Sequence, residues 1–534
     1  MKANIARRHL KRKRQDHKRK ARDRKIEAYR QRTLQRLKKA NREKYLRVAC
    51  NAGPVFNEVN IKYELADKAR GIVYGGAGLM LKLAKQVGLV DAIDRRLDLL
   101  KLHCPYHESD HVLNLALNAL CEGTCLQDIE LRRNDEVFLD ALGVAALPDP
   151  TTAGDFCRRF AEWGVADLMD AINEARVNVW KQQPQGFFDE AVIDVDGTLV
   201  VTTGECKDGM DISYKGTWGY HPLLVSLANT QEPLFIVNRS GNRPSEEGAA
   251  EWLNRGIKLC LGSGFRRVRL RGDTAFMQTP ELDAWDKAGV LFQFGYDAMP
   301  NLKQLAEELP SKSWRPLKRA AGQIAAENPR AKPVNIKRQV IRRREYLHLE
   351  LKSEEVAEFD YQPIACSQSY RMVVVRKNIS REKGEAVLFD EIRYLFYITN
   401  DRGRSREAIV FGCNDRCDQE NLIAHLASGV RALKAPVDNL VSNWAYMVST
   451  SIAWSLKAWS ALLPASPPQA GTQATGRRAW LRMEFKSWVH AAMKVPCQIV
   501  KRARRVIHRV LNGNHDLPGF FELSDLLASQ VQLC

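Results

Sequence analysis

A short run of β-branched residues that ends in acids is the feature that most limits the fold of this chain. The run AVIDVDGT occupies residues 191–198, and Asp194 and Asp196 alternate in it with Ile and Val. A run of this length, bounded by Gly, is typical of a strand. A second predicted strand, RVRLR at 267–271, ends just before Asp273. Two strands that both end at a carboxylate favour a sheet with acids gathered at one edge.

The elements around these two runs follow an α/β order. After the strand at 191–196, the pattern predicts strands at 221–227 and 233–238, a helix at 245–257, the strand at 267–271, a helix at 279–287 and a strand at 290–295. Three further strands, in an Arg-rich context, are predicted between residues 346 and 399. We expect these three strands to form a β-rich insertion within the α/β domain.

Positive charge is concentrated at two places in the chain. The whole sequence has 82 Lys and Arg against 63 acids, a net charge of +19. Residues 1–50 hold 21 basic and 4 acidic residues, and residues 471–510 hold 10 and one. The rest of the chain is weakly acidic. We interpret the basic ends as binding a polyanion such as DNA, although a solvated or disordered tail is the alternative for residues 1–50.

The sequence favours a protein without a membrane partner. No apolar stretch follows the charged N-terminus, as a secretory signal would require. The longest apolar stretch, residues 443–463, contains Asn, Ser, Thr and Lys457, so we expect a buried helix there. These features lead us to expect a cytoplasmic protein.

Six segments are expected from these patterns. They are a basic arm, helical or disordered (1–52), a helical DNA-binding or dimerisation domain (53–185), the first part of the α/β core (186–298), the β-rich insertion (299–400), a helical completion of the core (401–465), and a linker with a basic tail (466–534).

The acids at the strand ends are the candidates for chemistry. If their strands are neighbours, Asp196 and Asp273 converge and offer the oxygen ligands that Mg²⁺ or Mn²⁺ prefers. A third acid usually completes a site for two ions, and Glu420 is the candidate, sharing a helix face with Arg416. Asp415 and Asp418 are its rivals. Alternatively, acids at strand ends are simply turn or cap formers.

Five motifs stand out along the chain: IDVDGT (193–198), YKGTWGYHPLLV (214–225), NRSGNRPSEEGA (238–249), LRGDTAF (270–276) and NDRCDQENLI (414–423). Together they resemble bacterial insertion-sequence transposases with a DDE site, more narrowly those of the IS thirteen-eighty family. The helical segment 109–143 also resembles the N-terminal region of that family. The resemblance spans roughly residues 59–463.

The resemblance implies an RNase H-like core, interrupted by a β-rich insertion, with Asp196, Asp273 and Glu420 as catalytic residues and ligands of two metal ions. It also implies double-stranded DNA as the partner, both as inverted-repeat ends and as target, and a homodimer in the synaptic complex on the nucleoid. The wider group's motif is Tyr-x2-Arg-x3-Glu-x6-Lys, and here Cys413 and Ala427 replace its Tyr and Lys. Arg416 and Glu420 remain.

Two rival interpretations stay open at this stage. The run DVDGTLV at 194–200 also fits the signature of haloacid-dehalogenase-like phosphatases, in which Asp194 would be the nucleophile and Asp196 the acid/base. Asp194 could also be an additional metal ligand, because residues two apart in a strand share a face. The other rival is a non-catalytic DNA-binding protein in which the acids are structural.

Overall fold

A computed structural model describes most of the chain from residue 70 onward. The described residues are 70–529, apart from 102, 104, 205–206, 319–347, 384–385, 464–475, 503–504 and 512–515. The basic arm expected at residues 1–52 lies outside them.

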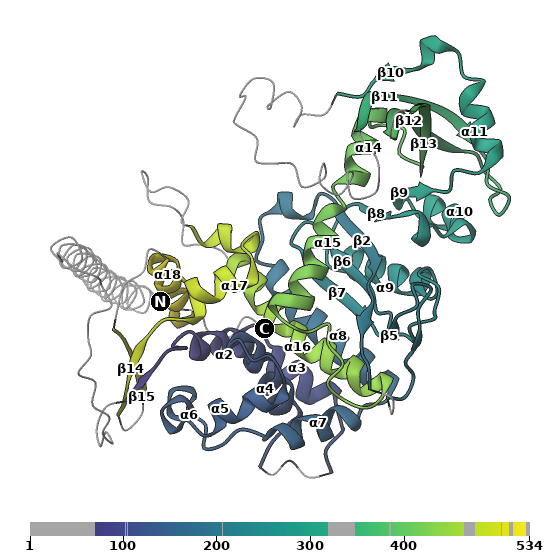
Figure 1. The fold of residues 1–534 in the computed structure, drawn as a ribbon. Coiled ribbons are helices and arrows are strands. Elements are labelled where there is room, and N and C mark those ends of the chain that lie inside the picture. The colour runs from purple at the N-terminus through teal and green to yellow at the C-terminus, as the bar shows by residue number, and fades with distance from the viewer. Residues whose placement is uncertain are drawn as a thin grey trace, which may run out of the picture.

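The first described part, which falls within the helical segment expected at residues 53–185, is helical. After the short strand β1 (Gly71–Ile72), its helices are α2 (Ala77–Gln86), α3 (Leu89–Arg96), α4 (Glu108–Leu120), α5 (Glu130–Arg133), α6 (Glu136–Leu142), α7 (Pro150–Arg158) and α8 (Glu162–Trp180). Apolar side chains of α4 and α8 are buried against the long helix α16 (Leu440–Leu462). The helical part therefore forms one core with a helix that lies more than 250 residues later in the chain (Figure 1).

A mixed sheet of nine strands forms the other part, in the order β10-β11-β12-β13-β9-β8-β2-β6-β7. Five of its strands are β2 (Ala191–Gly197), β6 (Leu223–Leu227), β7 (Glu232–Val237), β8 (Val268–Gly272) and β9 (Leu291–Tyr296), and α9 (Ala249–Gly262) and α10 (Leu282–Lys287) lie between them in the sequence. The predicted order of strands and helices is thus confirmed. Three short strands that the sequence did not predict, β3 (Val200–Val201), β4 (Asp211–Ile212) and β5 (Trp218–Tyr220), form a small separate sheet.

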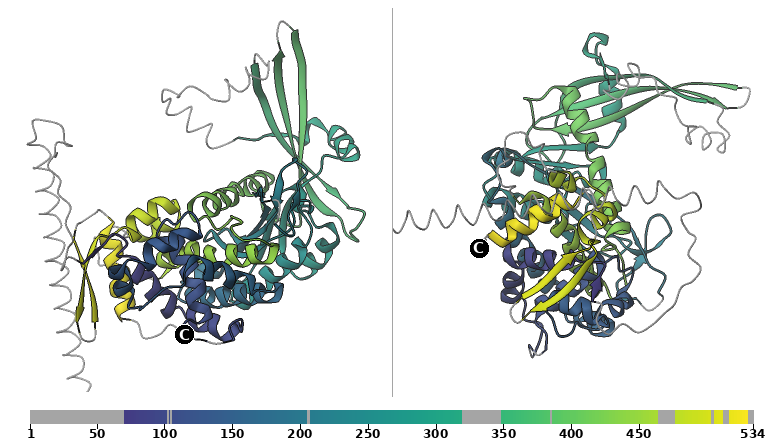
Figure 2. Two further views of the ribbon diagram at one scale, coloured as in Figure 1. Left: turned by 60° about the horizontal axis from the view of Figure 1, so that its bottom comes forward. Right: turned by 90° about the vertical axis from the view of Figure 1, so that its left-hand side faces the viewer.

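The strands expected to form an insertion are part of this same sheet. The strands β11 (His348–Tyr361), β12 (Tyr370–Lys383) and β13 (Ala386–Thr399) are long and antiparallel, and the short β10 (Arg315–Pro316) pairs with β11. β13 pairs with β9, from Phe396 opposite Tyr296 to Thr399 opposite Gln293. The outer ends of the three long strands project from the body of the molecule (Figure 2).

Helices cover both faces of the sheet around β2. Gly256 of α9 lies against Ile193 and Val225, and a Cβ added to this glycine would lie 3.4 Å from Ile193 Cδ1. Because side chains alternate along a strand, Asp194 and Asp196 face the opposite side, toward α14 (Arg406–Asn414) and α15 (Cys417–Ala424). The acids of β2 therefore lie under these two later helices.

The segment expected to be a basic tail is folded. It contains α17 (Phe485–Trp488), the hairpin of β14 (Cys497–Arg502) and β15 (Arg505–Val510), and α18 (Leu517–Ser529). β14 pairs with β1, and α18 packs against α2. Buried apolar side chains such as Trp480 and Trp488 anchor the described residues of this segment to the helical part.

A buried ion pair joins the helical part to the sheet. Arg176 of α8 and Glu232 of β7 are both fully buried, with 3.0 Å between Nε and Oε1. The indole N–H groups of Trp180 and Trp459 and the Thr230 hydroxyl also donate to the Glu232 carboxylate, at 3.1, 2.8 and 2.7 Å. Because every Glu232 oxygen is satisfied, the pair fixes α8 and α16 against β7 despite the cost of burying charge.

The helix expected at residues 443–463 is α16, and nearly all of its side chains are buried. Among the described residues, no helix combines the length and apolar character that crossing a membrane requires.

The buried amine of Lys457 in α16 makes folding stability depend on pH. Its side chain is 1% exposed, and burial lowers its pKa to about 7. In the unfolded chain the amine keeps its proton up to about pH 10. Between about pH 7 and pH 10 folding therefore releases this proton, and the free energy of unfolding increases with pH. Between about pH 8 and 9.5 we expect the free energy of unfolding to change with pH by different amounts in the wild type and in Lys457→Met. The slope of the wild type should exceed that of Lys457→Met by about 1.4 kcal/mol per pH unit.

Guanidinium unfolding at several pH values would measure both slopes. Parallel slopes for the wild type and Lys457→Met would show that Lys457 stays charged in the folded chain.

Candidate active site

Parallel pairing of β2 with β8 brings Asp196 and Asp273 to one edge of the sheet. The register places Ile193 beside Leu270 and Asp194 beside Arg271. Asp196 is therefore near the end of β2, and Asp273 directly follows β8. Asp273 also caps the short helix that begins at Thr274, since its Oδ1 accepts a hydrogen bond of 3.0 Å from the N–H of Ala275. The predicted neighbouring strands are confirmed.

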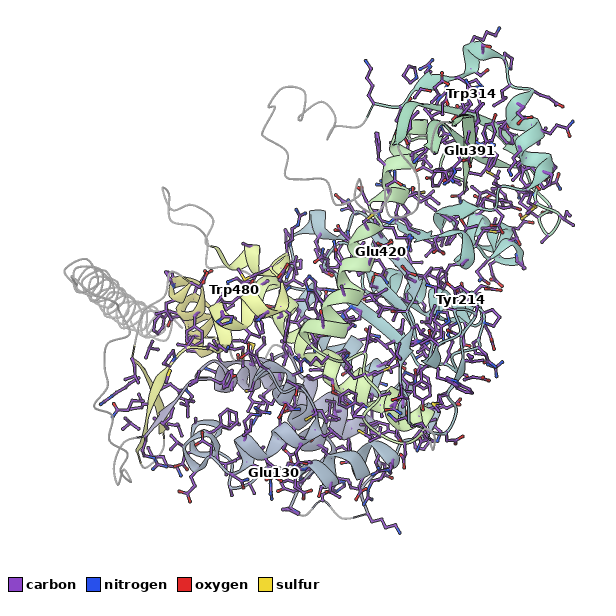
Figure 3. All side chains as sticks on the ribbon, viewed as in Figure 1. Glu130, Tyr214, Trp314, Glu391, Glu420 and Trp480 are labelled. Atoms are coloured by element: carbon purple, nitrogen blue, oxygen red, sulfur yellow. The ribbon has the colours of Figure 1, made fainter. Side chains whose placement is uncertain are left out.

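Helix α15 brings Glu420 over this edge. Gln419, the residue before it, is buried, and its amide donates to the carbonyl oxygen of Leu224 in β6 at 3.3 Å. The Ser226 hydroxyl donates to the other end of the same side chain. These contacts fix α15 beside β6 and β2, with Glu420 exposed at the end of the sheet (Figure 3).

The guanidinium of Arg416 lies among the three candidate carboxylates. Its Nη1 donates to Asp196 Oδ2 at 2.7 Å. Its Nη2 lies 3.9 Å from Asp273 Oδ2 and 3.9 Å from Glu420 Oε1. Asp196, Asp273 and Glu420, which come from three different elements, thus surround one cation of the protein itself.

Burial differs among the three carboxylates. The side chain of Asp196 is 14% exposed, whereas Asp273 and Glu420 are 40% and 64% exposed. Burial, with a smaller contribution from the charge of Asp273, raises the pKa of Asp196 to about 6 against the opposing effect of Arg416. The carboxylate of Asp196 is therefore the one that most needs a nearby cation to remain ionised at neutral pH.

Asp194 is held by a different arginine. Its two carboxylate oxygens accept from Nε and Nη2 of Arg271 at 2.6 and 2.7 Å, and its side chain is 1% exposed. Arg271 also donates to the carbonyl oxygen of Gly412 at 2.9 Å, which ties α14 to β8. Asp194 shares a strand face with Asp196, as predicted, but a bidentate buried ion pair leaves it no free oxygen edge for a ligand or substrate.

The rivals of Glu420, Asp415 and Asp418, are close to it in sequence but lie outside the cluster of carboxylates around Arg416. Asp415 ends α14 and Asp418 is in the first turn of α15, and both are exposed. Within the described residues, the ion pairs of Arg416 are with Asp196, Asp273 and Glu420, and none is with Asp415 or Asp418.

His221, which no sequence pattern singled out, lies beside this edge. Its Nε2 is 2.9 Å from the position that a Cβ on Gly197 would take, so Gly197 has no room for a side chain. Nδ1 lies 3.1 Å from the carbonyl oxygen of Arg243. The residue stands within the quoted motif at 214–225, but no spacing rule connects it to Asp196, since its position depends on how β5 turns into β6.

The donor set fits hard divalent cations. Three carboxylates offer only oxygen atoms, which Mg²⁺ and Mn²⁺ prefer, and they already surround a positive group in the form of Arg416. Such an edge can hold cations next to a phosphodiester bond.

A known family model matches most of the chain. The family model described as "Transposase DDE domain group 1" matches residues 72–515. A solved structure with some similarity is the piggyBac transposase synaptic complex with hairpin DNA, at 11% identity and a TM-score of 0.32 over 79% of this chain and 81% of that chain. No curated protein matches the sequence. Because the family model spans most of the chain, the protein belongs to the DDE transposase family.

Proposed function

We propose that this transposase serves a bacterial insertion sequence of the IS thirteen-eighty group, binding the terminal inverted repeats of its own element, cleaving DNA at these ends and joining them to target DNA. The convergence of Asp196, Asp273 and Glu420 around Arg416 is the observation that carries this proposal. The strands β2, β6, β7, β8 and β9 would be the RNase H-like core, with β10 to β13 as its extension.

Asp196, Asp273 and Glu420 would hold two Mg²⁺ or Mn²⁺ ions. When bound, such ions supply the Lewis acidity that activates a water or a 3′-hydroxyl and stabilises the leaving oxygen of a phosphodiester. The fold positions these three carboxylates. The pairing of β2 with β8 holds the two aspartates, and the hydrogen bond from Gln419 to Leu224 holds α15 and with it the glutamate. Arg416 offsets part of the negative charge of the three carboxylates, as bound metal ions would do in its place.

The basic segments and the helical part would hold the DNA. Residues 471–510 carry 10 Lys and Arg against one acid. Within this segment the described strands β14 and β15 lie against α6 of the helical part. Phosphate contacts from such a surface give binding that weakens strongly with salt. We propose that this surface, with the basic residues 1–50, binds the ends in a homodimer on the nucleoid in the cytoplasm.

The two rival functions fit less well. A phosphatase that uses Asp194 as nucleophile would need that carboxylate free, whereas Arg271 occupies both of its oxygens. A non-catalytic DNA-binding protein gives no reason for three acids from separate elements to converge at one sheet edge.

Removing either exposed ligand should stop strand cleavage but not DNA binding. On a labelled duplex carrying the terminal repeat and its flank, with Mg²⁺, we expect Asp273→Asn and Glu420→Gln to cut more than about 100-fold more slowly than the wild type, since loss of even an outer-shell partner costs 10–100-fold. Electrophoretic mobility shift with the same duplex would show unchanged binding.

Asp415→Asn is the matched control, because Asp415 is an exposed acid five residues before Glu420 that makes no ion pair with Arg416 among the described residues. We expect it to cut at the wild-type rate. Normal cutting by Glu420→Gln together with loss of cutting by Asp415→Asn would overturn the assignment of Glu420.

Replacing Arg416 should make cation binding tighter. In Arg416→Gln the three carboxylates lose their internal cation, so their mutual repulsion should lower the melting temperature of the metal-free chain. Mn²⁺ then no longer competes with a guanidinium for the carboxylates. We expect the Mn²⁺ dissociation constant, measured by calorimetry, to fall by about tenfold or more.

The control is Arg402→Gln, which removes an exposed arginine paired with Asp360 at 2.7 Å, outside the cluster. Its Mn²⁺ affinity should equal that of the wild type. Weaker Mn²⁺ binding by Arg416→Gln would mean that Arg416 organises the ligands rather than competing with the metal.

A further inference from the structure

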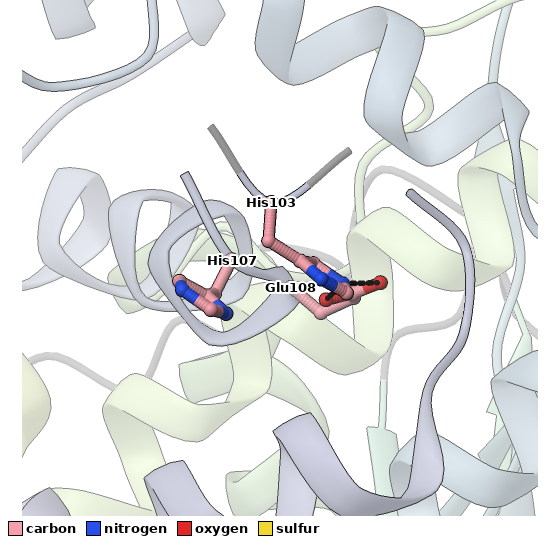
Figure 4. A group of neighbouring side chains, drawn as sticks. All are labelled: His103, His107 and Glu108. Carbon is pink, nitrogen blue, oxygen red and sulfur yellow. Dashed lines mark hydrogen bonds and ion pairs between the residues drawn. The ribbon is translucent and has the colours of Figure 1, made fainter. Parts of the chain in front are cut away.

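A second group of metal-ligating side chains lies where the segment after α3 meets the start of α4. His107 is the N-cap residue of α4 and Glu108 is its first residue, while His103 lies on the segment before them. One ligand atom from each of the three residues lies within 4.8 Å of the others. Figure 4 shows the two imidazole rings stacked, with an interaction between His103 and the Glu108 carboxylate.

Glu108 is a buried carboxylate that the backbone holds in a fixed position. Its side chain is 1% exposed, and Oε1 accepts from the N–H groups of Leu99 and Leu100, both at 3.0 Å. Burial acts to raise its pKa, but these N–H donors outweigh burial and the pKa is lowered. The second oxygen, Oε2, faces His103 Nε2 at 3.1 Å. The group thus offers a preformed anionic oxygen toward an imidazole.

The two imidazoles lie at the surface of the molecule. Their ring centroids are 4.9 Å apart, and their planes differ by 1°. A metal ion lies in the plane of each imidazole that binds it, so two parallel stacked rings must turn relative to one another before they share an ion. His107 is exposed and the His103 side chain is 47% exposed, so either ring can turn without disturbing a packed core.

We propose that His103, His107 and Glu108 form a second metal site, selective for a transition-metal ion, with Zn²⁺ as the best match. Two imidazole nitrogens and one carboxylate oxygen suit Zn²⁺ and leave a fourth position for water, whereas the all-oxygen site at Asp196 suits Mg²⁺. Binding here would fasten the segment that follows α3 to the start of α4, and α4 packs against α16. The ion would therefore stabilise the helical part, and this inference does not rest on the proposed catalytic function.

Zinc binding to the full chain tests the proposal. Calorimetry would be carried out in excess Mg²⁺, which occupies sites made only of oxygen ligands. We expect the wild type to bind about one Zn²⁺ per chain, and His103→Ala and His107→Ala to bind it at least about tenfold more weakly. Co²⁺ as a second probe should give visible absorption bands in the wild type and lose them in both variants. Zn²⁺ should raise the melting temperature of the wild type and not that of the variants.

The matched control is His490→Ala, which removes an exposed histidine on a different element. It should bind Zn²⁺ like the wild type. Because His103 and His107 are exposed, both variants should melt like the wild type without metal, which shows that they fold. Equal Zn²⁺ affinity and equal Co²⁺ spectra in the wild type and in folded His103→Ala and His107→Ala would overturn the proposal.

Discussion

The parallel pairing of β2 with β8 is the constraint on which the rest of the candidate site depends. This register sets the ends of both strands at one edge, so that Asp196 and Asp273 meet although they are far apart in sequence. It also sets Arg271 beside Asp194 in the adjacent row, where the two form a buried ion pair. A slip of one residue would turn Asp196 to the face covered by α9 and would abolish both arrangements.

Two arginines therefore give two neighbouring aspartates different roles. Asp194 makes two short contacts with Arg271 and is almost fully buried, which ties β2, β8 and α14 together. Asp196 shares Arg416 with two more exposed carboxylates, and that cluster lies at the end of the sheet. The buried pair holds the fold together, whereas we propose that the cluster around Arg416 exchanges this internal cation for metal ions. Strand alternation alone does not distinguish these roles.

The sequence predicted the strands, their order and the two aspartates at their ends, because alternation and strand length are local signals. It could not predict that Arg416 contacts Asp196 and Asp273, since an i,i+4 pattern reveals only its contact with Glu420. The pairing of β13 with β9 and the folding of the basic C-terminal segment depend on contacts between distant residues, such as β14 with β1. Trp480 and Trp488 are buried among the basic residues of that segment, and net charge carries no information about such packing.

Anomalous scattering from crystals of the full chain grown with Mn²⁺ and a DNA end would show whether metal ions bind at the candidate active site. We expect two Mn²⁺ peaks between the carboxylates of Asp196, Asp273 and Glu420, with the Arg416 guanidinium displaced from Asp196. Density for Mn²⁺ at Asp194, or none among the three carboxylates while Arg416 keeps its contact with Asp196, would contradict this expectation.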